Sequence, residues 1–565
     1  MAVATPDERE AIYRLRHEVY ACELHQHAEN DAGRLTDDVD GHNEFFAATI
    51  DGELAGCISV TPPGTGRFSV DKYVRREELP FPCDEGLYEV RLFTVAPRHR
   101  GSLVASLLFY SALRWVESRG GRRIVAVGRR EILDLYRHAG LQPLGREVKS
   151  GAVYFELMTA DVGELRRRLT RFRRTIERIE SSVDWALPIP FSSPEPCEHG
   201  GAFWDAIGDE FRSLGRGAEV INADVLDAWF PPSPAILEPL GRHLSWLART
   251  SPPTGCEGMV CAIARARGVN PRSVLPGDGS SALIYLALRE WLEPSSRALI
   301  LDPTYGEYAH LLEKVVKCSV DRLELSSDDG FRVDGARLAE RLEQSYDFVI
   351  LVNPNSPTGR HMPRAELEGV LSAAPRRTRF WIDETYVEYA DPGASLERFA
   401  AASENVVVAK SLSKVYALSG LRAAYLCAPI RLVDELRALT PPWAVSLPAQ
   451  VATVAALGDT EYYAQKWAQT RELREELARD LAATFRFRVF PSDANFLLCE
   501  LPPGAPSAAA LCDRCRGRGL FLRDQSSACR RLGDRFVRIA VKDRGTNRSM
   551  VEIIAAALSS ADSSA

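Results

Sequence analysis

AKSLSKVYALSGLR, residues 409–422, is the stretch that decides the fold of this chain. It places Lys414 next to the hydroxyls of Ser411 and Ser413, and Arg422 follows eight residues later. A lysine that forms an imine has to lose its proton near neutral pH, which burial and nearby cations promote. Hydroxyls and a forked guanidinium match the oxygens of a phosphate. The stretch therefore predicts a pyridoxal phosphate site in which Lys414 binds the aldehyde.

Two apolar runs upstream predict buried strands that end in polar residues. Phe380–Ile382 leads into Asp383, and Phe348–Val352 leads into the turn NPNSPTG at 353–359. In an open α/β sheet, ligands bind at the carboxyl ends of such strands. A buried carboxylate there can keep a pyridine nitrogen protonated, which we expect of Asp383. The alternative for an acid at a strand end is a helix N-cap.

Two earlier motifs complete the pattern. Leu299–Leu301 is followed by Tyr305, which could stack on a flat ring or pack in the core. The turn PGDGSSAL at 276–283 opens a predicted helix over Ala282–Trp291. Backbone N–H groups at a helix start bind phosphate well.

These four ordered motifs resemble those of class I/II aminotransferases of fold type I, especially histidinol-phosphate aminotransferases, over residues 217–560. The resemblance implies an α/β fold with a three-layer αβα large domain and a small domain. It also implies an α-amino acid or amine as substrate, and a homodimer as the active form.

The resemblance assigns a role to individual residues. For catalysis it implies Lys414, Asp383, Tyr386 and Tyr305. For cofactor binding it implies Ser280, Ser281, Tyr305, Asn355, Ser356, Asp383, Tyr386, Ser411, Ser413, Lys414 and Arg422. For substrate binding it implies Arg538, Asn495 and Trp229, with Arg538 gripping the α-carboxylate.

The sequence departs from the family pattern in two places, and the substrate loop at 222–230 fits that pattern loosely. Ser356 stands where an asparagine usually bonds the ring oxygen, and Asn355 is one residue away. Ser251 stands where a tyrosine usually reaches across the dimer to the phosphate. Transamination is the simplest interpretation. Elimination or substitution at Cβ or Cγ, carbon–carbon bond formation and decarboxylation stay open, although Arg538 argues mildly against decarboxylation.

The first 160 residues have a core pattern of their own. A predicted strand at Val90–Val95 is followed by PRHRGS at 97–102 and an apolar helix over Leu103–Val116. A strand at Arg123–Val127 and a helical stretch at Ile132–Ala139 come next. Basic residues and a glycine before a helix start favour a pyrophosphate.

This part resembles an α+β N-acyltransferase of the GNAT type, and its opening, residues 12–20, resembles the acyl-homoserine-lactone synthase branch. The resemblance implies acyl-CoA as a possible co-substrate, with Arg98, Arg100, Gly101 and Tyr136 as candidate residues. Leu103 replaces a small residue of the usual loop, and Tyr136 could equally pack a helix on the sheet. Both a bifunctional enzyme and a front domain that only supports assembly remain open.

The join between the two parts is expected at residues 161–216. Glu164–Glu180 predicts a basic helix, Ala186–Glu198 a proline-rich linker, and Gly200–Leu214 an amphipathic helix.

The composition of the chain limits the classes of protein to which it can belong. The 565 residues are 45% hydrophobic and 26% charged, as in ordinary globular proteins, and the formal charge of −7 gives no argument for nucleic acid. No apolar run suits a membrane span or a signal segment, so we expect a cytoplasmic enzyme, and the fusion favours specialised biosynthesis.

The 12 cysteines show no spacing typical of disulfide-bonded proteins. Cys512 and Cys515, with Cys529 nearby, lack partners for a metal site, so none is expected.

Overall fold

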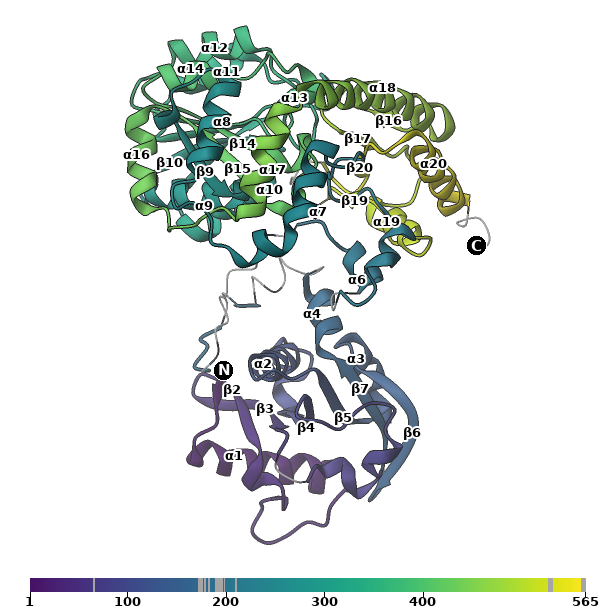
Figure 1. Cartoon of the computed structure of the whole chain (residues 1–565). Coiled ribbons are helices and arrows are strands. Elements are labelled where there is room, and N and C mark those ends of the chain that lie inside the picture. Colours follow the sequence, from purple (N-terminus) through teal and green to yellow (C-terminus); the bar gives the residue numbers. More distant parts are fainter. Residues whose placement is uncertain are drawn as a thin grey trace. The chain divides into compact units, whose positions relative to one another are not determined.

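The structure is a computed structural model that describes residues 1–64, 67–170, 176, 179–180, 183–187, 189, 197, 199–208, 211–526 and 532–559. The chain divides into two compact units, Met1–Ser193 and Pro194–Ala565. Figure 1 labels most of the helices and many of the strands of both.

The first unit is built on a seven-stranded sheet. Its order is β1 (Ala2–Val3), β2 (Glu44–Ile50), β3 (Glu53–Thr61), β4 (Leu87–Val95), β5 (Arg123–Arg129), β7 (Val153–Asp161) and β6 (Gln142–Ser150). Neighbours are antiparallel except β4 and β5, which run parallel. The helices are α1 (Pro6–Arg16), α2 (Val104–Ser118), α3 (Leu133–His138) and α4 (Val162–Thr170).

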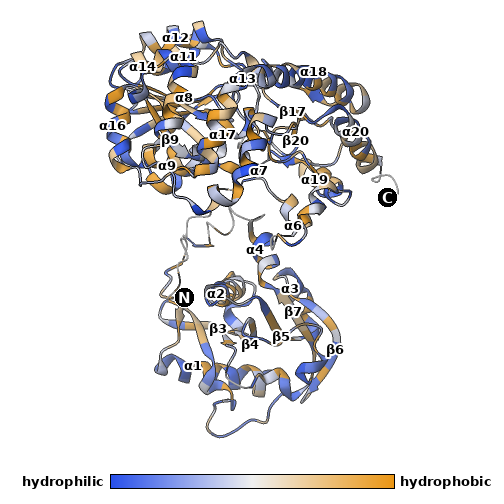
Figure 2. Ribbon diagram, in the orientation of Figure 1, coloured by the Kyte–Doolittle hydropathy of each residue, from blue (hydrophilic) through white to orange (hydrophobic). Residues whose placement is uncertain are grey.

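The core of this unit lies between α2 and the sheet. Leu108, Ala112 and Trp115 of α2 are buried against Phe46 and Ile58 of β2 and β3. Figure 2 shows the apolar residues on this helix and on the strands of the sheet. Burial of this apolar stripe fixes α2 across the sheet, so the predicted α+β fold is confirmed.

The second unit contains another seven-stranded sheet, and this one is mostly parallel. Its order is β11 (Ser319–Glu324), β10 (Arg297–Asp302), β12 (Phe348–Val352), β13 (Arg379–Asp383), β14 (Val406–Ser411), β15 (Ala423–Cys427) and β9 (Val274–Asp278). β15 runs antiparallel to both of its neighbours.

Successive residues of the central strands are buried on opposite faces of this sheet. On β12, Phe348 and Ile350 belong to one core and Val349 and Leu351 to the other. The first face is covered by α9 (Gly279–Trp291), α10 (Gly306–His310) and α16 (Ile430–Leu439). The second is covered by α11 (Gly335–Leu342), α12 (Arg364–Ala373) and α14 (Glu397–Ala402). Burial on both faces produces the predicted three-layer αβα arrangement.

A four-stranded sheet forms the smaller part of the second unit. Its order is β16 (Arg488–Val489), β17 (Phe496–Glu500), β20 (Phe536–Ala540) and β19 (Arg523–Asp524). A separate pair joins β18 (Leu520–Phe521) to β8 (Ile221–Asn222). The remaining helices are α6 (Phe203–Ile207), α7 (Pro234–Arg249), α8 (Glu257–Arg267), α13 (Val387–Ala390), α15 (Leu412–Val415), α17 (Leu447–Gly458), α18 (Thr460–Phe485), α19 (Ala508–Arg516) and α20 (Arg544–Ser559).

The segment between the units differs from its prediction. The helix expected over Gly200–Leu214 is wrong in extent, because α6 ends at Ile207, where Gly208 adopts φ +97°, and Leu214 only begins a short 3-10 helix to Ala218. That left-handed φ interrupts helical hydrogen bonding. The expected basic helix is described as α4 to Thr170, and most of its remainder and of the 186–198 linker lies outside the described residues.

Two further findings concern membrane and metal. In the part of the chain that the structure describes, no helix combines the length and apolarity needed to cross a bilayer. Nor do these residues bring three His, Cys, Asp or Glu side chains together as metal ligands. Cys512 and Cys515 are buried on α19, and Cys529 lies outside the described residues.

Candidate functional site

Lys414 lies at the carboxyl edge of the large sheet. β14 ends at Ser411, and α15 begins with the next residue and carries Lys414. The Lys414 Nζ lies 2.9 Å from Oδ1 of Asp227, on the segment that follows β8. Burial opposes ionisation of Asp227, but the Lys414 ammonium holds the pKa of this carboxyl below its ordinary value. The sequence predicts cations next to Lys414, whereas the group in contact is a carboxylate.

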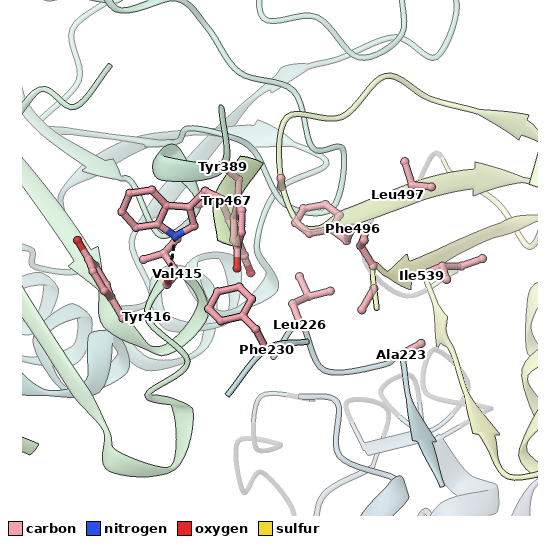
Figure 3. Close-up of a cluster of buried hydrophobic side chains, with 14 of the residues drawn as sticks. Ala223, Leu226, Phe230, Tyr389, Val415, Tyr416, Trp467, Phe496, Leu497 and Ile539 are labelled. Atoms are coloured by element: carbon pink, nitrogen blue, oxygen red, sulfur yellow. Dashed lines mark hydrogen bonds between the residues drawn. The ribbon is translucent and has the colours of Figure 1, made fainter. Parts of the chain in front are cut away.

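Three aromatic side chains fix the backbone around Lys414. Tyr389 donates to the Lys414 carbonyl at 2.7 Å, and Tyr463 donates to the Tyr416 carbonyl at 3.2 Å. The indole of Trp467 donates to the Val415 carbonyl at 2.8 Å, as the dashed line in Figure 3 shows. A four-residue helix cannot satisfy its own last carbonyls, so these donors hold the loop in place.

Lys410 has a different environment although it is only four residues away. It is buried on β14, with Nζ 2.8 Å from Oε1 of Glu388 and 3.7 Å from Oε2 of Glu384. Burial disfavours its charge, but the glutamates raise the pKa of Lys410 above its ordinary value. A lysine held charged and buried in this way is unsuited to imine formation.

Asp383 ends β13 and is held by three donors. Its Oδ1 accepts from the Thr385 N–H at 3.0 Å and the Thr385 hydroxyl at 2.7 Å. Its Oδ2 accepts from Tyr308 at 2.7 Å, which leaves one lone pair for a further donor such as a ring N–H. Burial raises the pKa of Asp383, and these donors oppose the shift. Tyr386 is also buried, which raises its pKa, and it lies edge-on to Phe496.

The residues proposed for the phosphate come together from two distant motifs. A Cβ added to Gly279 would lie 2.2 Å from Nη2 of Arg422, so the guanidinium lies against the start of α9. Gly279 itself has φ +79°. Ser411 and Ser413 are buried, and the Ser413 hydroxyl has no partner there. Free helix N–H groups, a cation and an orphaned hydroxyl fit the phosphate of pyridoxal phosphate.

Tyr305 presents a ring face beside this cradle. Its hydroxyl donates to Oε2 of Glu307 at 2.7 Å, and Ser281 donates to the same oxygen at 2.9 Å. His199 stacks on Tyr305 with centroids 5.9 Å apart and planes at 23°. Hydrogen bonds to Cys197 and Glu307 raise the pKa of His199 to about 10. The stack shows that this face accepts a flat ring. Ser280 is half-buried in the first turn of α9.

Arg538, the cation expected for a substrate carboxylate, is half-buried on β20. Its Nη1 donates to Ser356 at 3.3 Å and its Nη2 to the Asp224 carbonyl at 2.9 Å. Its Nε is buried without a partner, and burial lowers the pKa of the guanidinium. Asn495 donates to the Leu226 carbonyl at 3.0 Å, while its own Oδ1 has no partner. A buried donor and a buried acceptor without protein partners are typical of a ligand-binding site.

Two predicted residues are used elsewhere. Asn355 is fully buried, and its amide bonds Thr304, Pro303 and Thr358, so it ties two loops together and is not free to reach a ring oxygen. The indole of Trp229 donates to Thr470 of α18 at 2.9 Å, which directs its polar edge to that helix.

Three residues at the site were missed, namely Asp227, Glu307 and Lys542. Asp227 lies in a loop whose match to the family was loose, and Glu307 stands two residues after Tyr305. Lys542 follows β20, and its Nζ lies 3.5 Å from the Asp227 carbonyl. Nothing local in the sequence distinguishes these residues from surface charges.

In the first unit, both arginines expected to bind pyrophosphate are paired with carboxylates. Arg98 forms an ion pair with Glu53. Arg100 donates both terminal nitrogens to Glu23, at 2.7 and 2.6 Å. Gly101 has φ +80°, and Leu103, 54% exposed, precedes α2.

Near this loop, strands β4 and β5 stop pairing with each other. They pair only from Leu87/Arg123 to Val90/Ala126, and Leu92, at φ +55°, marks an irregularity in β4. Tyr136 is buried beneath this opening against Phe93 and Phe109, and burial raises its pKa. The structure thus places Tyr136 in the core, next to the ends of β4 and β5 that do not pair with each other.

Two family models match the chain. The model for aminotransferases of class I and II matches residues 244–558, and that for the GNAT family of acetyltransferases matches residues 9–141. Histidinol-phosphate aminotransferase of Methanocella arvoryzae is 30% identical over 295 residues, which are 52% of this chain and 78% of that protein.

Two solved structures share the fold. Histidinol-phosphate aminotransferase of Sinorhizobium meliloti, in complex with pyridoxal-5'-phosphate, has TM-score 0.55 and 20% identity, covering 65% of this chain and 100% of that one. L-threonine-O-3-phosphate decarboxylase of Porphyromonas gingivalis has TM-score 0.51 and 23% identity, covering 59% of this chain and 99% of that one. The chain therefore belongs to the class I and II aminotransferase family of pyridoxal phosphate-dependent enzymes, and its N-terminal part is a GNAT acetyltransferase domain.

Proposed function

We propose that the second unit transfers the amino group of an α-amino acid by pyridoxal phosphate chemistry. The observation that carries this proposal is the convergence of Lys414, Asp383 and the Gly279–Arg422 cradle at one sheet edge. When bound, the cofactor supplies an aldehyde for amines and a ring that accepts electrons.

The chain's own groups then have separate tasks. Arg422, Ser411 and Ser413 hold the phosphate, and Asp383 keeps a proton on the ring nitrogen. Lys414 Nζ would bind the aldehyde, and its amine would carry the proton of the substrate Cα. Asp227 holds this ammonium in place before the cofactor arrives.

Arg538 distinguishes transamination from one alternative. Its half-buried guanidinium, with a buried and orphaned Nε, suits a carboxylate that stays on the substrate, which disfavours decarboxylation. Elimination, substitution and carbon–carbon bond formation begin from the same bound amino acid, so the site residues favour none of them.

The test is to offer the purified protein a panel of L-amino acids with a keto acid as acceptor. We expect conversion of the cofactor to its amine form, seen in the absorption spectrum, and a keto acid from the donor, seen by mass spectrometry. Turnover to products that have lost a Cβ or Cγ substituent, with no net amino transfer, would replace transamination by one of the alternatives.

We also propose that the active form is a homodimer. α7 exposes Leu237, Leu244 and Trp246, each about half exposed, and it packs against α17, which exposes Val454. An apolar face on neighbouring helices is typical of an interface, and two-fold dimers are the commonest closed assembly. Light scattering of the active enzyme should give twice the chain mass, and a fully active monomer would refute this.

A second candidate activity concerns the first unit. Beyond Val90 and Ala126, β4 and β5 do not pair with each other, so the amide arm of an acyl-CoA could bind between them. Calorimetry of the full chain with acetyl-CoA tests this proposal. Absence of binding would support a domain that serves assembly.

A further inference from the structure

Lys542 follows Arg538 by four residues and lies on the same side of the small sheet. β20 ends at Ala540, but the Val541 N–H still donates to the Asn495 carbonyl at 2.8 Å, so the extended geometry continues. Side chains two and four residues apart on a strand share a face, which places Lys542 with Arg538. The backbone of Lys542 is held on both sides by Asn547, at 2.9 and 2.8 Å.

Both cations reach the same loop at carbonyl groups. Arg538 donates to the Asp224 carbonyl at 2.9 Å, and Lys542 to the Asp227 carbonyl at 3.5 Å. The loop's carboxylates are engaged elsewhere. Asp227 bonds Lys414, and Asp224 accepts from the Gly201 N–H and lies 3.8 Å from Arg523.

Lys542 therefore carries a charge that no side chain balances directly. Among the described residues, no carboxylate lies within ion-pair distance of its Nζ, and the side chain is half-buried. Burial and the nearby Lys414, against an opposing effect of Asp227, lower the pKa of Lys542 to about 8. A partly buried cation without a counter-ion is unfavourable, and an anion placed there would relieve the cost.

A substrate with only an α-carboxylate would satisfy Arg538 and leave Lys542 unpaired. We propose that Lys542 binds a second anionic group, carried on the side chain of the amino-acid substrate, while Arg538 binds the α-carboxylate. This inference depends on the proposed function, because it assigns the substrate class of the same site. The rival role is structural, with Lys542 pairing with Asp227 once Lys414 is bound to the cofactor.

The kinetic test compares substrates that differ only in that charge. L-glutamate is paired with L-glutamine, and O-phospho-L-serine with L-serine, so the two arms separate a carboxylate from a phosphate. In Lys542→Met, the ratio of kcat/KM for the acid over its neutral partner should fall about 10- to 100-fold, mainly through KM. Lys542→Arg should restore part of the ratio, and Lys314→Met, at an exposed site, serves as the matched control.

An equilibrium test needs no turnover. Glutarate should bind the holoenzyme more tightly than its monoamide, by calorimetry, and Lys542→Met should remove this preference. In the wild type, glutarate affinity should fall as pH rises through about 8, where Lys542 loses its proton, and the variant should lack this step. The charged groups that face Lys542 are Asp227, Lys414 and Asp543, and their substitution would shift the step without abolishing it.

The outcomes separate the two proposals. An unchanged acid-to-neutral ratio, or equal loss for both substrates of a pair, would overturn the role of Lys542 and favour the structural one. If no amino acid is turned over by the wild type but glutarate binding still depends on Lys542, the reaction class fails and the anion site stands.

Discussion

Two helix starts in this chain have similar sequence features but different chemistry. The start of α2 follows Arg98, Arg100 and a glycine at φ +80°, and the start of α9 is a glycine at φ +79° with Arg422 against it. In the first, both arginines are neutralised by Glu53 and Glu23. In the second, the guanidinium donates to the Ser419 carbonyl at 3.4 Å, and the hydroxyl of Ser413 is buried without a partner.

The difference shows that basic residues before a helix do not by themselves make an anion site. An arginine that is paired with a carboxylate attracts an anionic ligand only weakly. A phosphate has to displace the carboxylate before it can bind the guanidinium. A hydroxyl buried without a partner is an unfavourable arrangement that a phosphate oxygen would resolve. We therefore expect substitutions at the start of α9 to change ligand binding strongly, and substitutions at the start of α2 to change it weakly.

The largest expected effect is at the lysine next to the α9 cradle. Lys414→Ala should lower turnover by several orders of magnitude, because both the covalent anchor and the proton carrier are lost. Borohydride reduction followed by peptide mass spectrometry should show the cofactor on Lys414 in the wild type and on no lysine in the variant. A cofactor adduct on Lys410 would contradict the assignment.

Asp383→Asn should have the second-largest effect on turnover. A neutral amide cannot balance a protonated ring nitrogen, so turnover should fall about 10²- to 10³-fold while the cofactor stays bound. Single-turnover kinetics with a saturating amino acid measure the effect, and an absorption spectrum checks occupancy. Near-normal turnover would remove Asp383 from the mechanism.

The two glycines sharpen the comparison directly, because their backbone angles match. Gly279→Ala and Gly101→Ala should both cost about 1–2 kcal/mol of stability for the left-handed φ. Only Gly279→Ala adds a Cβ 2.2 Å from Arg422, whereas a Cβ at Gly101 meets nothing within 4 Å.

Cofactor affinity should therefore fall about 10- to 100-fold in Gly279→Ala alone, since a charge-assisted contact is displaced. Titration of apoenzyme with pyridoxal phosphate gives the affinity, and urea unfolding gives the stability. Equal losses of affinity in the two variants would mean that backbone strain, and not the cradle, explains them.

The smallest effect on stability and on amino-acid turnover is expected from substitutions before α2. The Arg98–Glu53 and Arg100–Glu23 pairs are exposed, so changing both arginines to alanine should cost no more than about 1 kcal/mol per pair. The pyridoxal phosphate reaction should persist, and any acyl-CoA binding should weaken. Thermal unfolding, amino-acid turnover and calorimetry measure the three quantities. Loss of turnover in a folded, dimeric double variant would show that the two units are coupled.

The sequence by itself determined several central strands that lead into the motifs, and the order of those motifs. Phe348–Val352 is predicted as a strand with the bounds that β12 has, because a continuous apolar run suits a strand buried on both faces. The contact between Gly279 and Arg422 could be anticipated from the family resemblance, since both motifs end at the same sheet edge. The early end of the helix predicted over 200–214 could not be anticipated, because no local sequence feature specifies the left-handed φ of Gly208.

Only the tertiary structure decided which charged groups face the site and which are already paired. Lys410 and Lys414 are four residues apart in the same motif, yet one is held by buried glutamates and the other by Asp227 at the sheet edge. Asp227 and Lys542 come from segments 315 residues apart in sequence. Coulombic and hydrogen-bonding partners are chosen by distance in space, which a residue's sequence neighbours do not encode.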